Sequence, residues 1–175
     1  MNAIYHTIGT RVSPAPSTQG NGGISMQTET NVIEVIGTKA GEVVNVLGAP
    51  IVIKSGGRPD QLFFADHPVP PGYGVPLHVH AAEDELFYVL EGEITLDSAE
   101  GPTTAGPGTF VHLPRGVAHG FRNAGAQPAR MLVVTTPGGG LEGVFRGLDA
   151  AARGPAQLDL AGVAAICAAH QVTMV

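Results

Sequence analysis

Short apolar runs separated by turn-forming residues fill the chain from about residue 32 to residue 136. Residues 86–90 form one continuous apolar run, which predicts a strand buried on both faces. Residues 43–62 hold shorter apolar pieces broken by Gly, Pro and Ser, and residues 130–136 predict a further buried strand. Residues 66–72 are rich in proline and predict a stiff loop. The pattern favours an all-β domain with tight turns, in agreement with the 25 glycines and 14 prolines of the chain.

The period of the apolar pattern changes after residue 136. A single stripe at helical spacing is formed by Leu141, Val144, Phe145 and Leu148. Gly154-Pro155 ends this predicted helix, and Asp159 is a candidate N-cap for a second helix that runs through about His170. We expect one or two short C-terminal helices within residues 141–170, packed on the outside of the β domain.

Two stretches of the chain each hold five residues at a fixed spacing, and together they supply three histidines and one glutamate. The first stretch, residues 72–92, contains Gly72, His78, His80, Glu85 and Gly92. The second, residues 108–123, contains Gly108, Pro114, Gly116, His119 and Asn123. At this chain's residue frequencies either pattern arises by chance roughly once in a million starts, so the match is specific.

The spacing allows these side chains to lie near one another. Successive side chains on a strand alternate between faces, so His78 and His80 point the same way and Val79 points oppositely. Gly92 lies in a turn after the strand that holds Glu85, with residues 94–96 beginning the return strand, and residues 114–116 form a turn before the strand of His119. Imidazole nitrogens with one carboxylate suit Fe, Mn, Co, Ni, Cu or Zn.

The two motifs resemble the cupin family and match both of its signature patterns at every position. The resemblance implies a double-stranded β-helix, or jelly-roll, barrel. It also implies one divalent transition metal per chain, held by His78, His80, Glu85 and His119. The alternative is a barrel that keeps the fold and has lost its metal.

A weaker resemblance runs from about residue 63 to residue 148 and is to single-domain bacterial quercetinase-like cupins. Its residues are Phe63-Phe64 before the first motif, then Thr136-Pro137-Gly138-Gly139, then residues 141–145. It implies a dioxygenase in which Glu85 also acts as the catalytic base. As aromatic residues that line the substrate we take Phe64, Tyr73, Phe87 and Phe121.

Composition limits the other functions open to the chain. At 175 residues it is long enough for one core that buries about 70% of its surface. The net charge of −6 argues against nucleic acid and anionic membranes as partners. A single cysteine fits a reducing compartment, so we expect a cytoplasmic protein, and no apolar run approaches the length of a membrane span. We also expect a homodimer.

Residues 1–25 differ from the rest because they are polar and rich in Pro and Gly. We interpret them as a flexible tail or the product of an upstream start codon, with an arm that pairs with a second subunit as the alternative. They lack the pattern of a secretory signal. Residues 26–175 then form a single domain.

The remaining reactive side chains have plainer interpretations. Cys167 lies among Ala and Ile and predicts a buried, inert thiol. His112 matches no ligand position and predicts a packing or surface role, and Arg115 predicts a surface charge. Three further histidines lie outside the motifs and are expected to be solvated: His6, His67 and His170.

Three functions remain open, since one fold serves many chemistries. The first is a metal-dependent dioxygenase acting with O2 on a flavonol-like or enolic small molecule. The second is a redox-neutral isomerase or lyase that uses the metal as a Lewis acid. The third is a small-molecule-binding barrel without turnover.

Overall fold

The computed structural model describes residues 33–38, 40–56, 61–154 and 158–175. All but the first two of these residues belong to one compact unit, Val35–Val175. The interpretation of residues 1–25, and that of His6, lies outside the described residues.

Strands make up most of the described part of this unit, and two helices precede the last strand. The strands are β1 (Glu42–Val46), β2 (Ala49–Ser55), β3 (Phe63–Val69), β4 (Gly74–His80), β5 (Asp84–Glu91), β6 (Ile94–Ser98), β7 (Thr103–Ala105), β8 (Phe110–Leu113), β9 (His119–Arg122), β10 (Ala129–Thr136) and β11 (Val172–Met174). The helices are α1 (Gly140–Ala152) and α2 (Leu160–Ala169).

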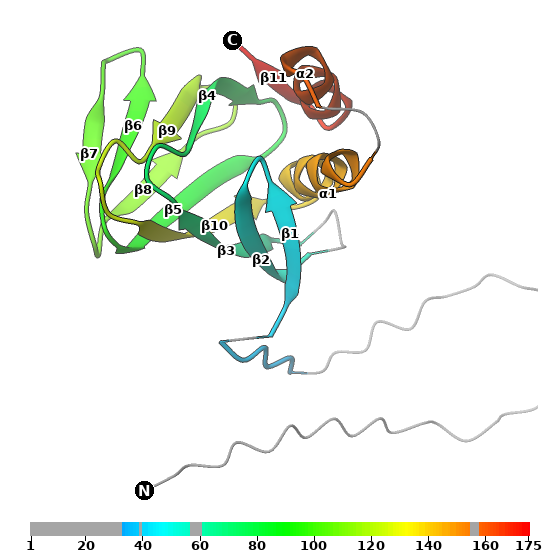
Figure 1. The fold of residues 1–175 in the computed structure, drawn as a ribbon, viewed down its shortest axis with the longest axis horizontal. Helices are drawn as coiled ribbons and strands as arrows, with labels where there is room; N and C mark the ends of the chain where they lie inside the picture. The colour runs from blue at the N-terminus through cyan, green and yellow to red at the C-terminus, as the bar shows by residue number, and fades with distance from the viewer. Residues whose placement is uncertain (1–32, 39, 57–60, 155–157) are drawn as a thin grey trace, which may run out of the picture. The chain divides into compact units, whose positions relative to one another are not determined.

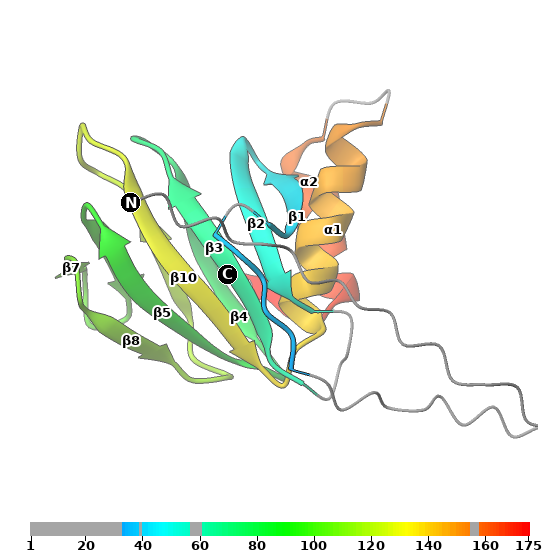
Figure 2. The same ribbon diagram turned by 90° about the horizontal axis from the view of Figure 1, so that it is seen from below.

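The strands form two antiparallel sheets that face each other. Among the described residues, the six-stranded sheet has the order β1-β2-β3-β10-β5-β8, and the five-stranded sheet has the order β11-β4-β9-β6-β7 (Figures 1 and 2). Their inner faces bury residues such as Phe63, Phe87, Ile94 and Met131, which are at most 1% exposed. This arrangement is the double-stranded β-helix expected from the motifs, with two C-terminal helices, so the predicted fold class is confirmed.

Strand β5 is buried on one face only, and the prediction of burial on both faces is wrong. Glu85, Phe87 and Val89 point into the core, whereas Tyr88 is 43% exposed. A strand in an antiparallel sheet with one solvated face shows this alternation. The apolar outer residues of β5 made the run look continuous in the sequence.

Residues 66–69 belong to a strand, although the prolines predicted a loop over residues 66–72. Strand β3 continues to Val69, and Pro68 pairs with Arg130 of β10. The described pairing of β3 with β2 extends no further than Asp66, so a residue without an N–H fits at position 68. This correction matters because it turns His67 inward.

The turn at Gly92 sends the chain from one sheet to the other, so residues 94–96 do not return beside β5. Gly92 has φ +68°, and a Cβ there would lie 2.6 Å from the Pro128 carbonyl oxygen, so a glycine is required. Strand β6 pairs with β7 and β9 in the five-stranded sheet. The turn predicted at residues 114–116 is present, with Val117 N–H donating to the Pro114 carbonyl at 3.2 Å.

The helices lie along the sheet edges, α1 beside β1 and α2 beside β11 (Figures 1 and 2). The predicted N-cap is present, since the Asp159 side chain accepts a hydrogen bond from Gly162 N–H at 2.8 Å. The prediction that both helices pack on the outside of the barrel is incomplete, because their apolar sides also line its cavity. Strand β11, which the sequence did not predict, pairs with β4 and aligns Val172 with His80.

Candidate metal centre

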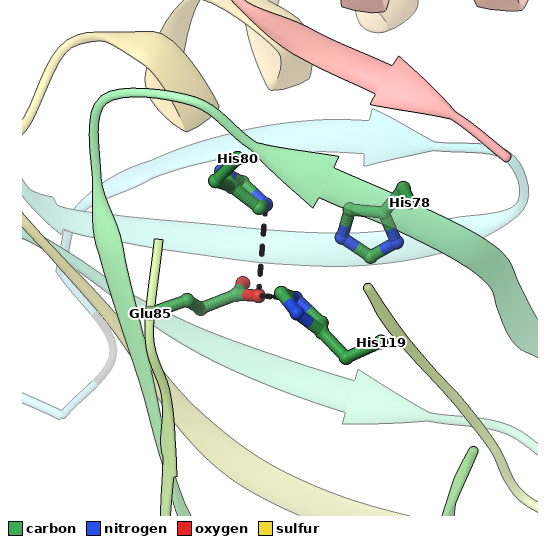
Figure 3. Close-up of side chains that lie close together, drawn as sticks. All are labelled: His78, His80, Glu85 and His119. Atoms are coloured by element: carbon green, nitrogen blue, oxygen red, sulfur yellow. Dashed lines mark hydrogen bonds and ion pairs between the residues drawn. The ribbon is translucent and has the colours of Figure 1, made fainter. Parts of the chain in front are cut away.

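Both sheets contribute to a cluster of three imidazoles and one carboxylate (Figure 3). His78 and His80 lie on β4, and His119 is the cross-strand partner of His78 on β9. Glu85 comes from β5 in the facing sheet. One ligand atom from each of the four residues lies within 4.8 Å of the other three. All four side chains are buried, so the expected alternation of His78 and His80 and the pairing of their strand with that of His119 are as the spacing predicts.

Backbone carbonyls fix two of the imidazoles. His78 Nδ1 donates to the Pro76 carbonyl and His119 Nδ1 to the Val117 carbonyl, both at 2.9 Å. In each case the acceptor lies two residues before the histidine, and the bond leaves the Nε2 lone pair directed away from it. Metal-binding histidines commonly carry such an outer hydrogen bond, which sets the tautomer and the ring orientation.

His80 provides the test of whether these residues fit a metal ion. Both of its ring nitrogens are buried, and neither has a hydrogen bond within the described part of the chain. Its Nε2 lies 3.7 Å from Glu85 Oε2, and its Nδ1 lies 3.5 Å from Glu83 Oε2. Buried polar atoms without partners are costly. A metal ion bound by His80 Nε2 and Glu85 would give Nε2 a partner, and a small movement of Glu83 would give Nδ1 one. The residues of the cluster therefore fit a metal ion.

Glu83 is a second buried carboxylate that the sequence analysis did not single out. It accepts hydrogen bonds from Gly140 N–H at 2.7 Å and from Leu141 N–H at 2.8 Å. It therefore caps the first turn of α1, where the helix dipole favours a negative charge. The only sequence signal was that two further acidic residues, Glu83 and Asp84, lie between His80 and Glu85 at positions that the motif leaves unspecified.

The environment favours the metal-binding, deprotonated states of Glu85 and His78 but the protonated state of His80, where a metal would have to displace a proton. Burial by itself raises the pKa of Glu85, but in the metal-free chain a proton on His119 Nε2, 3.0 Å from Glu85 Oε2, and the nearby imidazoles lower the pKa below its usual value. Burial lowers the pKa of His78. Burial also lowers that of His80, but the adjacent carboxylates of Glu83 and Glu85 outweigh it and raise this pKa. An ionised carboxylate beside a neutral imidazole is ready to coordinate.

An apolar cavity of about 70 Å³ opens from the cluster, with His67, His78, His80 and Glu85 among its lining residues. The sheets supply Val46, Leu47, Tyr73, Val75, Pro76, Phe121, Val133, Val172 and Met174 to its wall, and the helices supply Leu141, Val144, Phe145, Leu148, Val163 and Cys167. A second hollow of about 330 Å³ lies beside Glu83, but His80 is the sole member of the cluster among its lining residues. We take the apolar cavity as the binding space because it reaches three of the four candidate ligands.

The aromatic residues expected around the substrate lie in different places. Tyr73 and Phe121 line the cavity. Phe87 is not among the lining residues. It is buried against Phe121, with the two ring centroids 5.4 Å apart. Phe64 is not among them either, because the neighbouring Phe63 takes the inward position on β3.

The other reactive side chains are placed as follows. Cys167 lines the cavity, and burial raises the pKa of its thiol, in keeping with an inert group. His112 is exposed, and Arg115 forms an ion pair with Asp84 at 2.9 Å. His170 is half-buried against Gly143. His67 is 2% exposed, so its predicted solvation is wrong; it follows Phe63 and Ala65 on the inner face of β3, which the prolines around it concealed in the sequence.

Comparison with known proteins gives the family. Residues 67–135 match the model of the Cupin domain. The uncharacterized protein MJ1618 from Methanocaldococcus jannaschii is 30% identical over 114 residues, which are 64% of this chain and 86% of that protein. The chain belongs to the cupin superfamily.

Two characterised relatives differ from each other in reaction. The polyketide cyclase RemF from Streptomyces resistomycificus has a similar structure, with a TM-score of 0.52 and 28% identity over 59% of this chain and 79% of that one. Quercetin 2,3-dioxygenase from Bacillus subtilis is 32% identical over 69 residues, which are 39% of this chain but 20% of that enzyme. These similarities support the family and do not single out quercetinase. No helix in the described ranges is long and apolar enough to cross a membrane.

Proposed function

We propose that this protein is a metal-dependent dioxygenase that acts on a compact enolic small molecule. The observation that carries the proposal is that an apolar cavity opens from the buried cluster of His78, His80, Glu85 and His119, three of which line it. Such a site binds a small anion at the metal and keeps bulk water away from it. An enolate is electron-rich and reacts with O2 at a transition metal, and an apolar wall suits both reactants.

The ligand residues have different roles in the proposed reaction. When bound, a divalent transition metal supplies Lewis acidity that favours the enolate over the enol. Glu85 Oε2, 3.0 Å from His119 Nε2, has a lowered pKa and is therefore ionised, and it would accept the hydroxyl proton of an incoming enol whose acidity a bound metal raises. His78 and His119 stay fixed through their bonds to Pro76 and Val117, so the geometry is set before the substrate arrives.

The size of the cavity narrows the substrate class. About 70 Å³ of it is open to the centres of water-sized spheres, and its wall is mostly apolar. A short 1,3-dicarbonyl compound suits a narrow apolar space of this kind, so we take the enolic half of the sequence expectation forward.

A second candidate is a redox-neutral reaction of an enolate, such as an isomerisation or a cyclisation. The similarity to the polyketide cyclase RemF supports it, since the match covers 79% of that chain. In this case Glu85 would accept and return the same proton, and O2 would play no part.

The experiment loads the purified protein separately with Fe(II), Mn(II), Co(II), Ni(II), Cu(II) and Zn(II) and records O2 uptake with acetylacetone. Uptake that depends on metal and substrate, and is absent from His119→Ala, is the expected result. Product formation that continues under strict anaerobiosis would replace the dioxygenase with the redox-neutral enzyme. Binding of acetylacetone without product under either condition would leave a binding protein.

A further inference from the structure

One titratable side chain on the cavity wall has no role in the metal cluster. His67 lies on β3 of the six-stranded sheet, is 2% exposed and lines the cavity together with His78, His80 and Glu85. It matches no motif position. Its surroundings decide whether it is a packing residue or a functional one.

The ring of His67 is held rigidly. Nδ1 donates to the Pro68 carbonyl at 2.7 Å. The rings of Tyr73, Phe121 and Phe145 meet it edge to face, with centroids 5.4, 5.7 and 6.4 Å away. The imidazole therefore keeps one orientation, in which its other nitrogen points away from Pro68.

That other nitrogen, Nε2, makes no hydrogen bond to any described residue. Burial lowers the pKa of His67 to about 4, so the imidazole is neutral near pH 7. With Nδ1 carrying the single proton, Nε2 presents a lone pair and acts only as an acceptor. Among the described side chains, the polar atoms that are both fully buried and unpartnered are those of His80, so His67 Nε2 keeps some access to the cavity, where a ligand hydroxyl can reach it.

A trapped water is a poorer partner for this nitrogen than a ligand is. A buried water is stable when it makes about two to four hydrogen bonds. The wall around His67 is formed by Tyr73, Phe121 and Phe145, and the Tyr73 hydroxyl already donates to the Val46 carbonyl at 3.2 Å. A water at His67 Nε2 would find no second partner among these three rings.

We propose that His67 determines substrate specificity by accepting a hydrogen bond at Nε2 from a hydroxyl group of the substrate. The inference rests on the proposed function and deepens it. The substrate class becomes an enolic compound that binds the metal through its enolate oxygen and carries a further hydroxyl group toward His67. His67 recognises this hydroxyl and does not take part in the chemistry.

The test uses two small hydroxamates as stable, redox-inert mimics of a metal-bound enolate. Acetohydroxamate and glycolohydroxamate differ by one hydroxyl group and are close to the cavity in size. Calorimetry with the zinc-loaded protein measures both dissociation constants. We expect glycolohydroxamate to bind about 3- to 10-fold more tightly than acetohydroxamate, the value of one hydrogen bond to a buried acceptor.

Two substitutions test the roles of Nδ1 and Nε2 of His67 separately. His67→Asn places an amide N–H near the position of Nδ1, so it can keep the bond to Pro68 while removing the acceptor in the cavity. His67→Gln places an amide oxygen near the position of Nε2 and restores an acceptor. We expect the preference for glycolohydroxamate to disappear in His67→Asn and to return in part in His67→Gln. The matched control is His112→Asn, which removes an exposed histidine and should leave the preference unchanged.

The outcomes separate this inference from the proposed function. Equal binding of both hydroxamates by the wild type, or a preference that survives in His67→Asn, overturns the role of His67 and leaves enolate binding intact. A parallel loss of both affinities in His67→Asn and His67→Gln means that His67 acts through packing, and this also overturns the proposal. If the wild-type zinc protein binds neither compound, the proposed function fails and the inference fails with it.

Discussion

The two ends of the cavity are built on different principles. At the metal end, four buried side chains are held by strand register, by carbonyl hydrogen bonds to His78 and His119 and by the nearby carboxylate of Glu83. At the helix end, the wall consists of apolar side chains of α1 and α2, among them Val144, Leu148 and Val163. The metal end is directional, whereas the helix end is set by packing alone.

This difference separates reactivity from selectivity. A hydrogen-bonded donor set has one working geometry, so a change in any member has a large effect. A packed apolar wall adjusts to small changes in volume and alters affinity in steps. We therefore expect substitutions at the metal end to abolish function and those at the helix end to redirect it.

The largest effect is expected from removing one imidazole of the cluster. His78→Ala, His80→Ala and His119→Ala each delete one of four donors, so metal affinity should fall well beyond about 100-fold. The barrel should stay folded, because its core comes from residues such as Phe63 and Met131. Elemental analysis after dialysis against a chelator, with circular dichroism as the check of folding, measures both. Full stoichiometric metal in all three variants would show that the cluster is not the binding site.

Glu85→Gln comes next, since it keeps the shape of the side chain and removes its basicity. A general base contributes about 10² to 10⁴ in rate, so turnover should fall by that factor. Metal loss should be milder than for a histidine variant, because an amide oxygen still coordinates weakly. Single-turnover kinetics at saturating metal provide the measurement, and turnover near that of the wild type would remove the base role.

Glu83→Gln tests whether the carboxylate behind His80 belongs functionally to the metal end. The amide can still accept from Gly140 N–H but carries no charge toward His80 Nδ1. We expect metal affinity to fall about 10- to 100-fold, with a loss of roughly 1 kcal/mol in stability from the weakened helix cap. A chelator competition assay measures the affinity, with Glu93→Gln on the exposed surface as the control. Unchanged affinity would confine Glu83 to capping α1.

The acid sensitivity of the metal-free protein tests the burial of His67. Its pKa is lowered from 6.5 to about 4 in the folded chain, so between these values the unfolded chain binds the extra proton and the folded chain does not. Stability is therefore lost as the pH falls from about 6.5 to about 4, by about 2 kcal/mol between pH 7 and pH 5. Denaturant unfolding of wild type and His67→Asn at both pH values isolates this contribution. Equal losses in the two proteins would place the acid sensitivity elsewhere.

The same contrast explains which parts of the fold and of the site could be predicted from the sequence. Period-two alternation predicted that His78 and His80 share a face, and the resemblance to the cupin signatures implied that Glu85 and His119 join them. The apolar stripe of α1 and the Asp159 cap were also readable from the sequence.

What the sequence could not supply depends on contacts between distant segments. His67 was assigned to a loop because prolines follow it, and only the pairing of β3 with β10 turns its ring inward. The role of Glu83 depends on hydrogen bonds from Gly140 N–H and Leu141 N–H, which lie 57 and 58 residues further along the chain. The outer residues of β5 looked buried because hydrophobicity does not reveal which face of a sheet is solvated.

The smallest effect is expected at the helix end, where Leu148→Ala should enlarge the cavity without touching the cluster. Leu148 is 3% exposed on α1 and lines the cavity wall. One methylene in an apolar pocket changes discrimination by about 10-fold or more, so we expect propionohydroxamate to gain about 10-fold over acetohydroxamate in the zinc-loaded variant. The matched control is Leu113→Ala, a buried leucine of β8 outside the cavity lining, which should lose stability and keep the wild-type preference. The same shift in both variants would mean that loosened packing, and not the helix wall, sets ligand size. A shift confined to Leu148→Ala, with metal content unchanged, would assign selectivity to the helix end.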